Sequence, residues 1–297
     1  WSEHDFMLHG WKNDINDNQH PFMDKIAPEK CDNSLKSWQW KGQFLLNTDE
    51  LKSREETSKS RRNSFYPRRK FMGECQRDYG RVMILVLYTT KTLPTGTNGR
   101  TMSCYASLSD YKLVRVDVDI NENVNAVCAK HKRTKYKKYC AAAEFLQDTD
   151  WMLVVDDNTA IANPNHCIEE WIDNRVNIIF PEQFQNWEIS DENYLVRRSE
   201  WSINFLRELA DKEFNPPRGQ SRYDKGVLLT HLAQVLVDGG DIEVYQCTAH
   251  WATKIGHDAS SACGRLVLGY QRLWPGKVRI YKKAHSWIRN SALTNNL

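Results

Sequence analysis

The sequence predicts an α/β domain in which helices flank a mostly parallel central sheet. Short apolar runs rich in β-branched residues predict buried strands at 81–90, 111–119, 151–155 and 176–180. Segments typical of helices lie between these runs, at 102–110, 136–148 and 165–173. Strands and helices that alternate at this spacing favour right-handed crossovers and therefore a mostly parallel sheet.

The C-terminal third of the chain adds further elements to this expectation. Two amphipathic segments predict helices at 199–214 and 223–237. The residues expected to cap their N-termini are Ser199 and Asp224. Two short runs predict late strands at 241–247 and 277–283.

The composition changes near residue 78, which predicts three segments. Residues 78–297 carry the strand and helix pattern and are expected to form a single α/β domain. Residues 49–77 are dense in charge and poor in apolar side chains, which is typical of a flexible basic linker. Residues 1–48 have some apolar character and are expected to pack on the main domain.

The bulk composition argues against two classes of partner. The chain has 41 Lys and Arg against 38 Asp and Glu, a net charge of +3. This balance and the lack of a recognised motif argue against nucleic-acid binding. No apolar run approaches the roughly 18 residues of a membrane span. The eight cysteines fit no CxxC metal pattern, so disulfides and buried free thiols both remain open.

One predicted strand ends in a cluster of polar side chains that could hold a metal ion. The run WMLVV is followed by Asp156, Asp157 and Asn158. Ligands of open α/β sheets bind beyond the carboxyl ends of the strands, and Mg²⁺ or Mn²⁺ needs several oxygen ligands. Side chains that alternate along the strand would place Asp156 and Asn158 on one face. A helix cap or a solvated turn is the alternative for such an acidic strand end.

A basic run at residues 130–138 has six Lys or Arg in nine positions. It could neutralise a diphosphate group. A solvated face of a helix is the simpler interpretation of such a charge run, and the sequence favours it.

Several long segments together resemble a family that is expanded in nematodes and known as DUF273. The segments are 4–12, 151–173, 184–214, 223–232 and 272–290. That family is in turn similar to the GT-A glycosyltransferases, and most of all to the retaining galactosyl-, mannosyl- and xylosyltransferases. The resemblance implies a GT-A-like nucleotide-diphospho-sugar transferase fold with an Asp-x-Asp metal site for Mn²⁺ or Mg²⁺.

The resemblance also assigns roles to residues of this chain. Asp156 matches the first Asp of the Asp-x-Asp motif, but Asn158 replaces the second one and brings no charge to the cation. Asp157 could compensate if the turn rotates. The residues that would face the nucleotide are Thr89, Thr90 and Lys91. The residues implied near the donor sugar or the acceptor, where catalysis would occur, are Glu188, Asn193 and Asp224.

His9 is implied as a further metal ligand. In the related transferases a late His in a segment like DFMLHGWK binds the metal, and in the DUF273 family that segment follows one like AHSWIRN. Here DFMLHGWK stands at the head of the chain and AHSWIRN at its tail. The order indicates a circular permutation or a window cut from tandem copies. Either way, His9 is expected within about 20 Å of Asp156, judged from the radius of gyration of such a domain.

The resulting functional expectation is a metal-dependent transferase. It would move a sugar from a nucleotide-sugar donor to a glycan or glycoprotein acceptor. The alternative is a weakened or inactive member that binds a nucleotide sugar or a glycan without turnover, which Asn158 favours. A Golgi or secretory lumen is implied by the resemblance alone.

Overall fold

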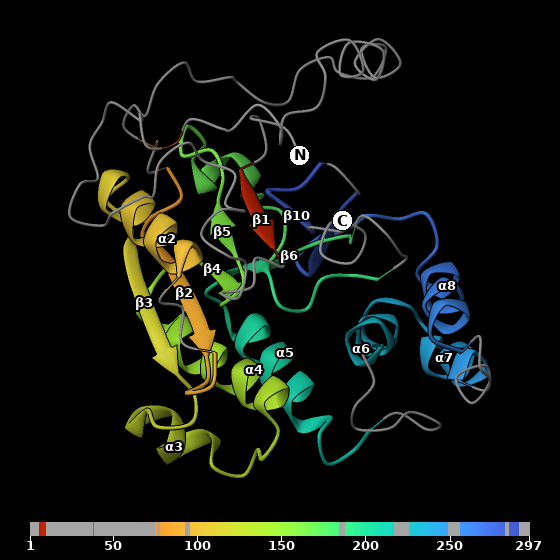
Figure 1. The fold of residues 1–297 in the computed structure, drawn as a ribbon. Coiled ribbons are helices and arrows are strands. Elements are labelled where there is room, and N and C mark those ends of the chain that lie inside the picture. Colours follow the sequence, from red (N-terminus) through yellow and green to blue (C-terminus); the bar gives the residue numbers. More distant parts are fainter. Residues whose placement is uncertain are drawn as a thin grey trace, which may run out of the picture.

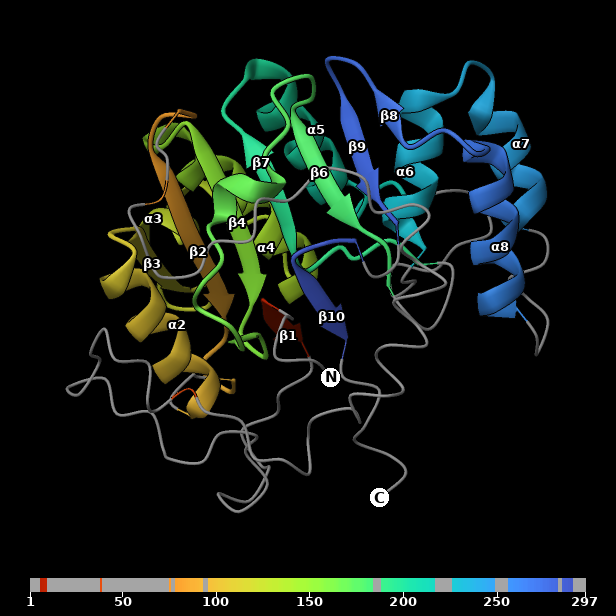
Figure 2. The same cartoon turned by 90° about the horizontal axis from the view of Figure 1, so that it is seen from above.

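The computed structural model describes residues 6–9, 38, 75, 78–92, 96–183, 188–216, 226–248, 256–282 and 285–290. The expected linker at 49–77, apart from Cys75, and most of residues 1–48 lie outside this described part of the chain. Within it, helices cover both faces of a central sheet (Figure 1), and a small second sheet lies near one end of the strands of that sheet (Figure 2).

The central sheet has seven strands in the order β3-β2-β4-β7-β6-β9-β8. Its strands are β2 (Val82–Tyr88), β3 (Lys112–Asp117), β4 (Trp151–Asp156), β6 (Ile178–Pro181), β7 (Tyr194–Arg197), β8 (Leu273–Trp274) and β9 (Val278–Tyr281). The expectation of a mostly parallel sheet is wrong. The sheet is mixed, because β7 runs antiparallel to both of its neighbours and β8 runs antiparallel to β9. An antiparallel neighbour needs no helical crossover, so the chain returns from β6 to β7 without one.

A three-stranded sheet joins segments from the two ends of the described chain. Its order is β10-β1-β5, and its strands are β1 (Met7–His9), β5 (Ala160–Ile161) and β10 (Ile288–Asn290). β1 pairs in parallel with β10 and antiparallel with β5. The strands β1 and β10, which are far apart in the sequence, therefore lie side by side. Their partner β5 follows the central strand β4 in the chain, so the small sheet lies near the end of β4.

Four of the seven α-helices among the described residues agree with the sequence pattern. The seven helices are α2 (Thr97–Leu108), α3 (Glu122–Cys128), α4 (Thr134–Phe145), α5 (Glu200–Asp211), α6 (Val227–Leu236), α7 (Gly240–Thr248) and α8 (Gly256–Leu268), with 3₁₀ turns η5 (Leu146–Asp148) and η6 (Ile168–Trp171). Residues 241–247 form α7 rather than a strand, and a disulfide fastens this helix to α8. The expected helix at 165–173 is only the 3₁₀ turn η6.

The two predicted helix caps have different outcomes. Ser199 caps α5 as expected, since its side chain accepts a hydrogen bond from the backbone N–H of Ser202. Gly226, rather than Asp224, is the N-cap of α6. Asp224 itself lies outside the described residues.

The central sheet is buried on both faces, which explains the unbroken apolar run of β2. Met83, Leu85 and Leu87 join a core under the helices α4, α5 and α6. Val82 and Ile84 face the opposite core, which includes residues of α2 and of the small sheet.

Every cysteine in the described part of the chain is in a disulfide. The pairs defined there are Cys75–Cys167, Cys128–Cys140 and Cys247–Cys263. The alternative of free thiols is therefore wrong for these residues. Within the same part of the chain, none of the helices has the length and apolar character needed to span a membrane.

His231 on α6 makes the stability of the fold sensitive to acid. Its ring lies 4.7 Å from that of Phe205, and neither ring nitrogen has a hydrogen bond to a described residue. Burial and the positive charge of Lys212 lower the pKa of His231 from 6.5 to about 3, although Glu208 lies 3.9 Å away. The folded state therefore takes up this proton only at much lower pH than the unfolded state.

We expect the free energy of unfolding to fall by up to about 1.4 kcal/mol per pH unit between pH 6.5 and pH 3 because of His231. Above pH 6.5 this contribution to stability is fully present. The measurement is urea unfolding at several pH values, in the wild type and in His231→Phe, which keeps an aromatic ring beside Phe205. Equal pH slopes in the two proteins would contradict the assignment.

Candidate metal and substrate site

The candidate site lies at the edge of the central sheet where β2, β4, β6 and β9 end (Figure 2). The antiparallel strand β7 begins at this same edge, because it runs opposite to β4 and β6. Residues that follow β4 and residues that precede β7 therefore meet there. Sheets of this type bind their ligands at such an edge.

The register between β4 and β7 explains why a second carboxylate joins Asp156. Val154 pairs with Tyr194. Continuing this antiparallel register by two residues places Asp156 opposite Glu192. Side chains alternate along a strand, so both carboxylates point to the face that carries Val154 and Tyr194.

His9 completes this group from the small sheet. Its Nε2 atom lies 3.2 Å from Glu192 Oε2 and 3.6 Å from Asp156 Oδ2. β1 brings it there because Met7 pairs with Ile161 of β5, which follows the turn after β4. The separation of His9 from Asp156 is well below the 20 Å expected from the sequence. Trp1 and Leu297 lie outside the described residues.

The group has the donor set of a divalent metal site. The ligand atoms of His9, Asp156 and Glu192 all lie within 4.8 Å of one another. Two carboxylates suit Mn²⁺ or Mg²⁺, and imidazole is a common ligand of divalent metals. The residues present therefore fit the implied metal, with Glu192 as a candidate ligand that the sequence did not suggest.

The charges of the group are strongly coupled. Burial lowers the pKa of His9, but the carboxylates of Asp156 and Glu192 outweigh it and raise the pKa from 6.5 to about 10. Burial would raise the pKa of Asp156, yet His9 and Lys138 hold it well below its ordinary value. Burial and the charge of Asp156 raise the pKa of Asp157 from 3.8 to about 6. A bound cation would take the place of the proton on His9, because a ligand imidazole is neutral.

Two lysines of the basic run face this site, so the expectation of a solvated helix face is wrong for these two. Lys138 Nζ lies 2.9 Å from Asp156 Oδ1, and Lys135 pairs with Asp191. Both lysines are on α4, one turn apart. The Cys128–Cys140 disulfide joins α3 to α4 across the run.

A hollow of about 160 Å³ opens beside these lysines. Its walls are Leu87, Thr134, Lys135, Lys138, Tyr139, Val154, Val155, Asp156, Asp191, Glu192 and Tyr194. Small-molecule pockets usually enclose roughly 300–1,000 Å³. This hollow is therefore large enough for only part of a substrate, and it brings that part next to the carboxylates and the lysines.

Asn158 and Asn193 support Asp156 from two sides. Asn158 Nδ2 donates to Asp156 Oδ2 at 3.1 Å. Asn193 is fully buried, and its Oδ1 accepts from the backbone N–H of Asp156 and from the hydroxyl of Thr159. Asn193 thus stabilises the turn after β4 through these hydrogen bonds. Because its side chain is fully buried, it has no exposed surface for the sugar contact expected from the sequence.

The other residues expected at the site have no described contact with the metal group. Thr90 Oγ1 donates to Asp117 Oδ2 at the ends of β2 and β3, and Thr89 forms a turn with Thr92. Lys91 is exposed beside them. Glu188 is buried beyond the end of β6. Asp224 lies outside the described residues.

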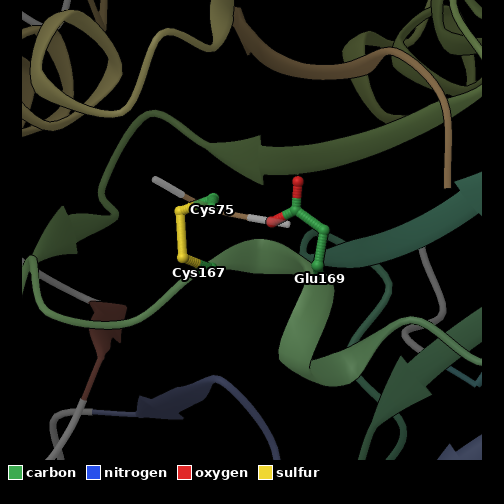
Figure 3. Close-up of side chains that lie close together, drawn as sticks. All are labelled: Cys75, Cys167 and Glu169. Atoms are coloured by element: carbon green, nitrogen blue, oxygen red, sulfur yellow. A yellow bond between two sulfur atoms is a disulfide. The ribbon is translucent and has the colours of Figure 1, made fainter. Parts of the chain in front are cut away.

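A second metal-like group in the described chain has a different explanation. Cys75, Cys167 and Glu169 lie close together, as a metal site would require (Figure 3). The two sulfur atoms are bonded to each other as a disulfide. Glu169 accepts a hydrogen bond from the hydroxyl of Tyr111. Disulfide sulfur is a poor metal ligand because the thiolate is the binding form, so the group is structural.

The family assignment follows from comparison with known proteins. Residues 102–297 match the model of the family DUF273, described as a protein of unknown function. The chain belongs to this family. Comparison with curated proteins found no match.

A solved structure among those that match is similar over part of the chain. It is a glycosyltransferase involved in the glycosylation of the major capsid of PBCV-1, 15% identical, with a TM-score of 0.38. The match covers 50% of this chain and 74% of that one. A likeness of this size does not define the fold.

Proposed function

We propose that this protein is a metal-dependent glycosyltransferase that moves a sugar from a nucleotide-diphosphate donor to a glycan acceptor. The observation that carries the proposal is the convergence of His9, Asp156 and Glu192 at the end of the central strand, beside Lys135 and Lys138. This combination of a divalent-metal donor set with adjacent lysines suits a diphosphate. The fold class, α/β with a GT-A-like arrangement, is part of the same proposal.

In this proposal His9, Asp156 and Glu192 hold Mn²⁺ or Mg²⁺. When bound, the metal supplies positive charge to the diphosphate that leaves during transfer. Lys138 and Lys135 add fixed positive charge at the same place, which stabilises the leaving group without reorganisation of solvent. Thr89, Thr90 and Lys91 follow β2, and Thr90 donates to Asp117 at the end of β3, where the nucleotide would be held. Asn158 and Asn193 keep the Asp156 carboxylate in position.

The test is calorimetry of the full chain with a panel of nucleotide sugars, with and without Mn²⁺. We expect at least one donor to bind more tightly in the presence of Mn²⁺. Incubation of that donor with glycan acceptors, followed by mass spectrometry, should then detect the transferred sugar. A panel in which no donor binds with Mn²⁺ would contradict the proposal.

The second candidate function is a binding protein that does not turn its donor over. It is favoured by Asn158, which contributes a hydrogen bond to Asp156 but no negative charge. In this case the donor would bind and no product would form.

Asn158→Asp separates the two functions. If the site is a working metal site, the added charge is expected to tighten Mn²⁺ binding by about tenfold, equivalent to ~1.4 kcal/mol. Asn174→Asp is the matched control, because Asn174 is exposed and follows η6 away from the cluster. The measurement is Mn²⁺ titration by calorimetry. Unchanged Mn²⁺ affinity in Asn158→Asp would support the inactive binder.

We also propose that the protein works in an oxidising compartment such as a secretory lumen. The support is that all described cysteines form disulfides, which reducing cytosol does not maintain.

A further inference from the structure

A cluster of two arginines and one glutamate lies on the same edge of the sheet as the metal group. Glu182 directly follows β6, Arg265 is on α8, and Arg272 precedes β8. Arg265 Nη2 donates to Glu182 Oε1 at 2.9 Å, and Arg272 Nη1 lies 2.9 Å from the same oxygen. Arg265 and Glu182 are almost completely buried, with 5% and 7% of their surfaces exposed.

This cluster has more positive charge and more donors than Glu182 can satisfy. Two guanidinium groups face one carboxylate, which leaves a net charge of +1. Nε and Nη1 of Arg265 and Nε of Arg272 are buried without a hydrogen bond to a described residue, while Nη1 of Arg272 pairs with Glu182. Buried donors in folded proteins are nearly always satisfied, and a buried charge is costly unless it is paired. Unused donors on two neighbouring guanidinium groups match the geometry of an oxyanion.

The register of the strands places this cluster at the same distance along the strands as the metal group. Leu195 of β7 pairs with Leu153 of β4 and with Ile179 of β6. Asp156 is three residues beyond Leu153, and Glu182 is three residues beyond Ile179. The two carboxylates therefore point to the same face of the sheet, on strands that are separated by β7.

The cluster lies on the side of the metal group away from the expected nucleotide. Strands β2 and β3, which carry Thr90 and Asp117, flank β4 on one side, and β7 and β6 flank it on the other. A donor that spans β3 to β4 leaves the β6 side free. The acceptor must approach from there to reach the sugar.

We propose that Arg265 and Arg272 bind an oxyanion on the acceptor, either a carboxylate or a sulfate group of an acidic sugar. This assignment rests on the proposed transferase function, which defines the acceptor side. The cluster makes the acceptor an acidic glycan rather than a neutral one.

The experiment titrates the full chain with three sugars and follows binding by NMR. The sugars are methyl β-glucuronide, glucose 6-sulfate and neutral methyl β-glucoside, so the first two separate a carboxylate from a sulfate. We expect at least one acidic sugar to bind about tenfold more tightly than the neutral sugar, and added salt to weaken it. Equal binding of all three sugars would overturn the proposal.

Variants assign the binding to the cluster. Arg272→Gln, which changes the more exposed arginine, should weaken the acidic sugar by about tenfold. Glu182→Gln removes the carboxylate that competes for the two arginines, so it should tighten binding of the acidic sugar. The two variants thus have opposite expected effects on binding, although each of them removes one partner of an Arg–Glu ion pair. Arg197→Gln, at the opposite end of β7, is the matched control and should have no effect. Thermal unfolding confirms that each variant is folded, and an unchanged affinity in Arg272→Gln and Glu182→Gln would refute the site.

Titration of the same samples with nucleotide sugars and Mn²⁺ distinguishes the two proposals. If donors bind and acidic sugars do not, the oxyanion site is wrong while the transferase function stands. If acidic sugars bind through Arg272 and no donor binds, the oxyanion site stands and the transferase function is wrong.

Discussion

Asp156→Ala is expected to abolish Mn²⁺-dependent donor binding. Asp156 is the most central of the three metal-group residues, since it contacts His9 and also accepts from Lys138 and Asn158. Its removal takes away a negative ligand and leaves His9 and Lys138 without their shared partner. Outer-shell changes alone cost roughly 10–100-fold in metal affinity, so loss of a direct ligand should cost at least about 100-fold.

The measurement is calorimetry with Mn²⁺ and the best donor of the panel. Asp148→Ala is the control, because Asp148 is an exposed carboxylate at the opposite end of β4 from the metal group. Circular dichroism checks that both variants are folded. Donor binding that is unchanged in Asp156→Ala would contradict the metal-dependent transferase.

Loss of the Cys75–Cys167 disulfide is expected to cost about 4 to 5 kcal/mol of the free energy of unfolding. The bond joins cysteines that are 92 residues apart, and a cross-link that closes a long loop restricts the unfolded chain most. It also ties the chain before β2 to the turn that precedes η6. The variant Cys75→Ser with Cys167→Ser removes it without leaving a free thiol.

Denaturant unfolding of the double variant measures this loss. The matched control is Cys128→Ser with Cys140→Ser, which removes a bond between cysteines only 12 residues apart and should cost about 3 kcal/mol. A smaller loss for the longer loop would show that the Cys75 segment contributes little to the fold. A reducing agent should destabilise the wild type in the same direction.

The sequence was sufficient for the elements whose pattern is local. The strands β2 and β4 and the helix α5 follow from apolar periodicity and from the cap at Ser199, because each is decided by the side chains of its own segment. The polar strand end at Asp156 could likewise be read from the chain. DUF273 membership agrees with the resemblance in the C-terminal two thirds.

The local sequence pattern predicted the wrong secondary structure where tertiary packing decides it. Residues 241–247 combine Ile242, Val244 and Tyr245 as a strand does, yet they form α7 and are fastened to α8 by the Cys247–Cys263 disulfide. Such short apolar runs do not distinguish a helix from a strand, and long-range packing decides between them.

The sequence predicted only some of the residues of the site, because the others reach it through the topology of the sheet. Sequence patterns drew attention to the carboxyl ends of predicted parallel strands, and so to Asp156. Glu192 precedes a strand, and it reaches the site because β7 is antiparallel, which no local pattern reveals. Lys138 reaches it because of the way α4 packs on the sheet, and Arg265 and Glu182 meet only across α8 and β6. Chemistry that depends on residues distant in sequence is decided by strand direction and register, which only the folded chain fixes.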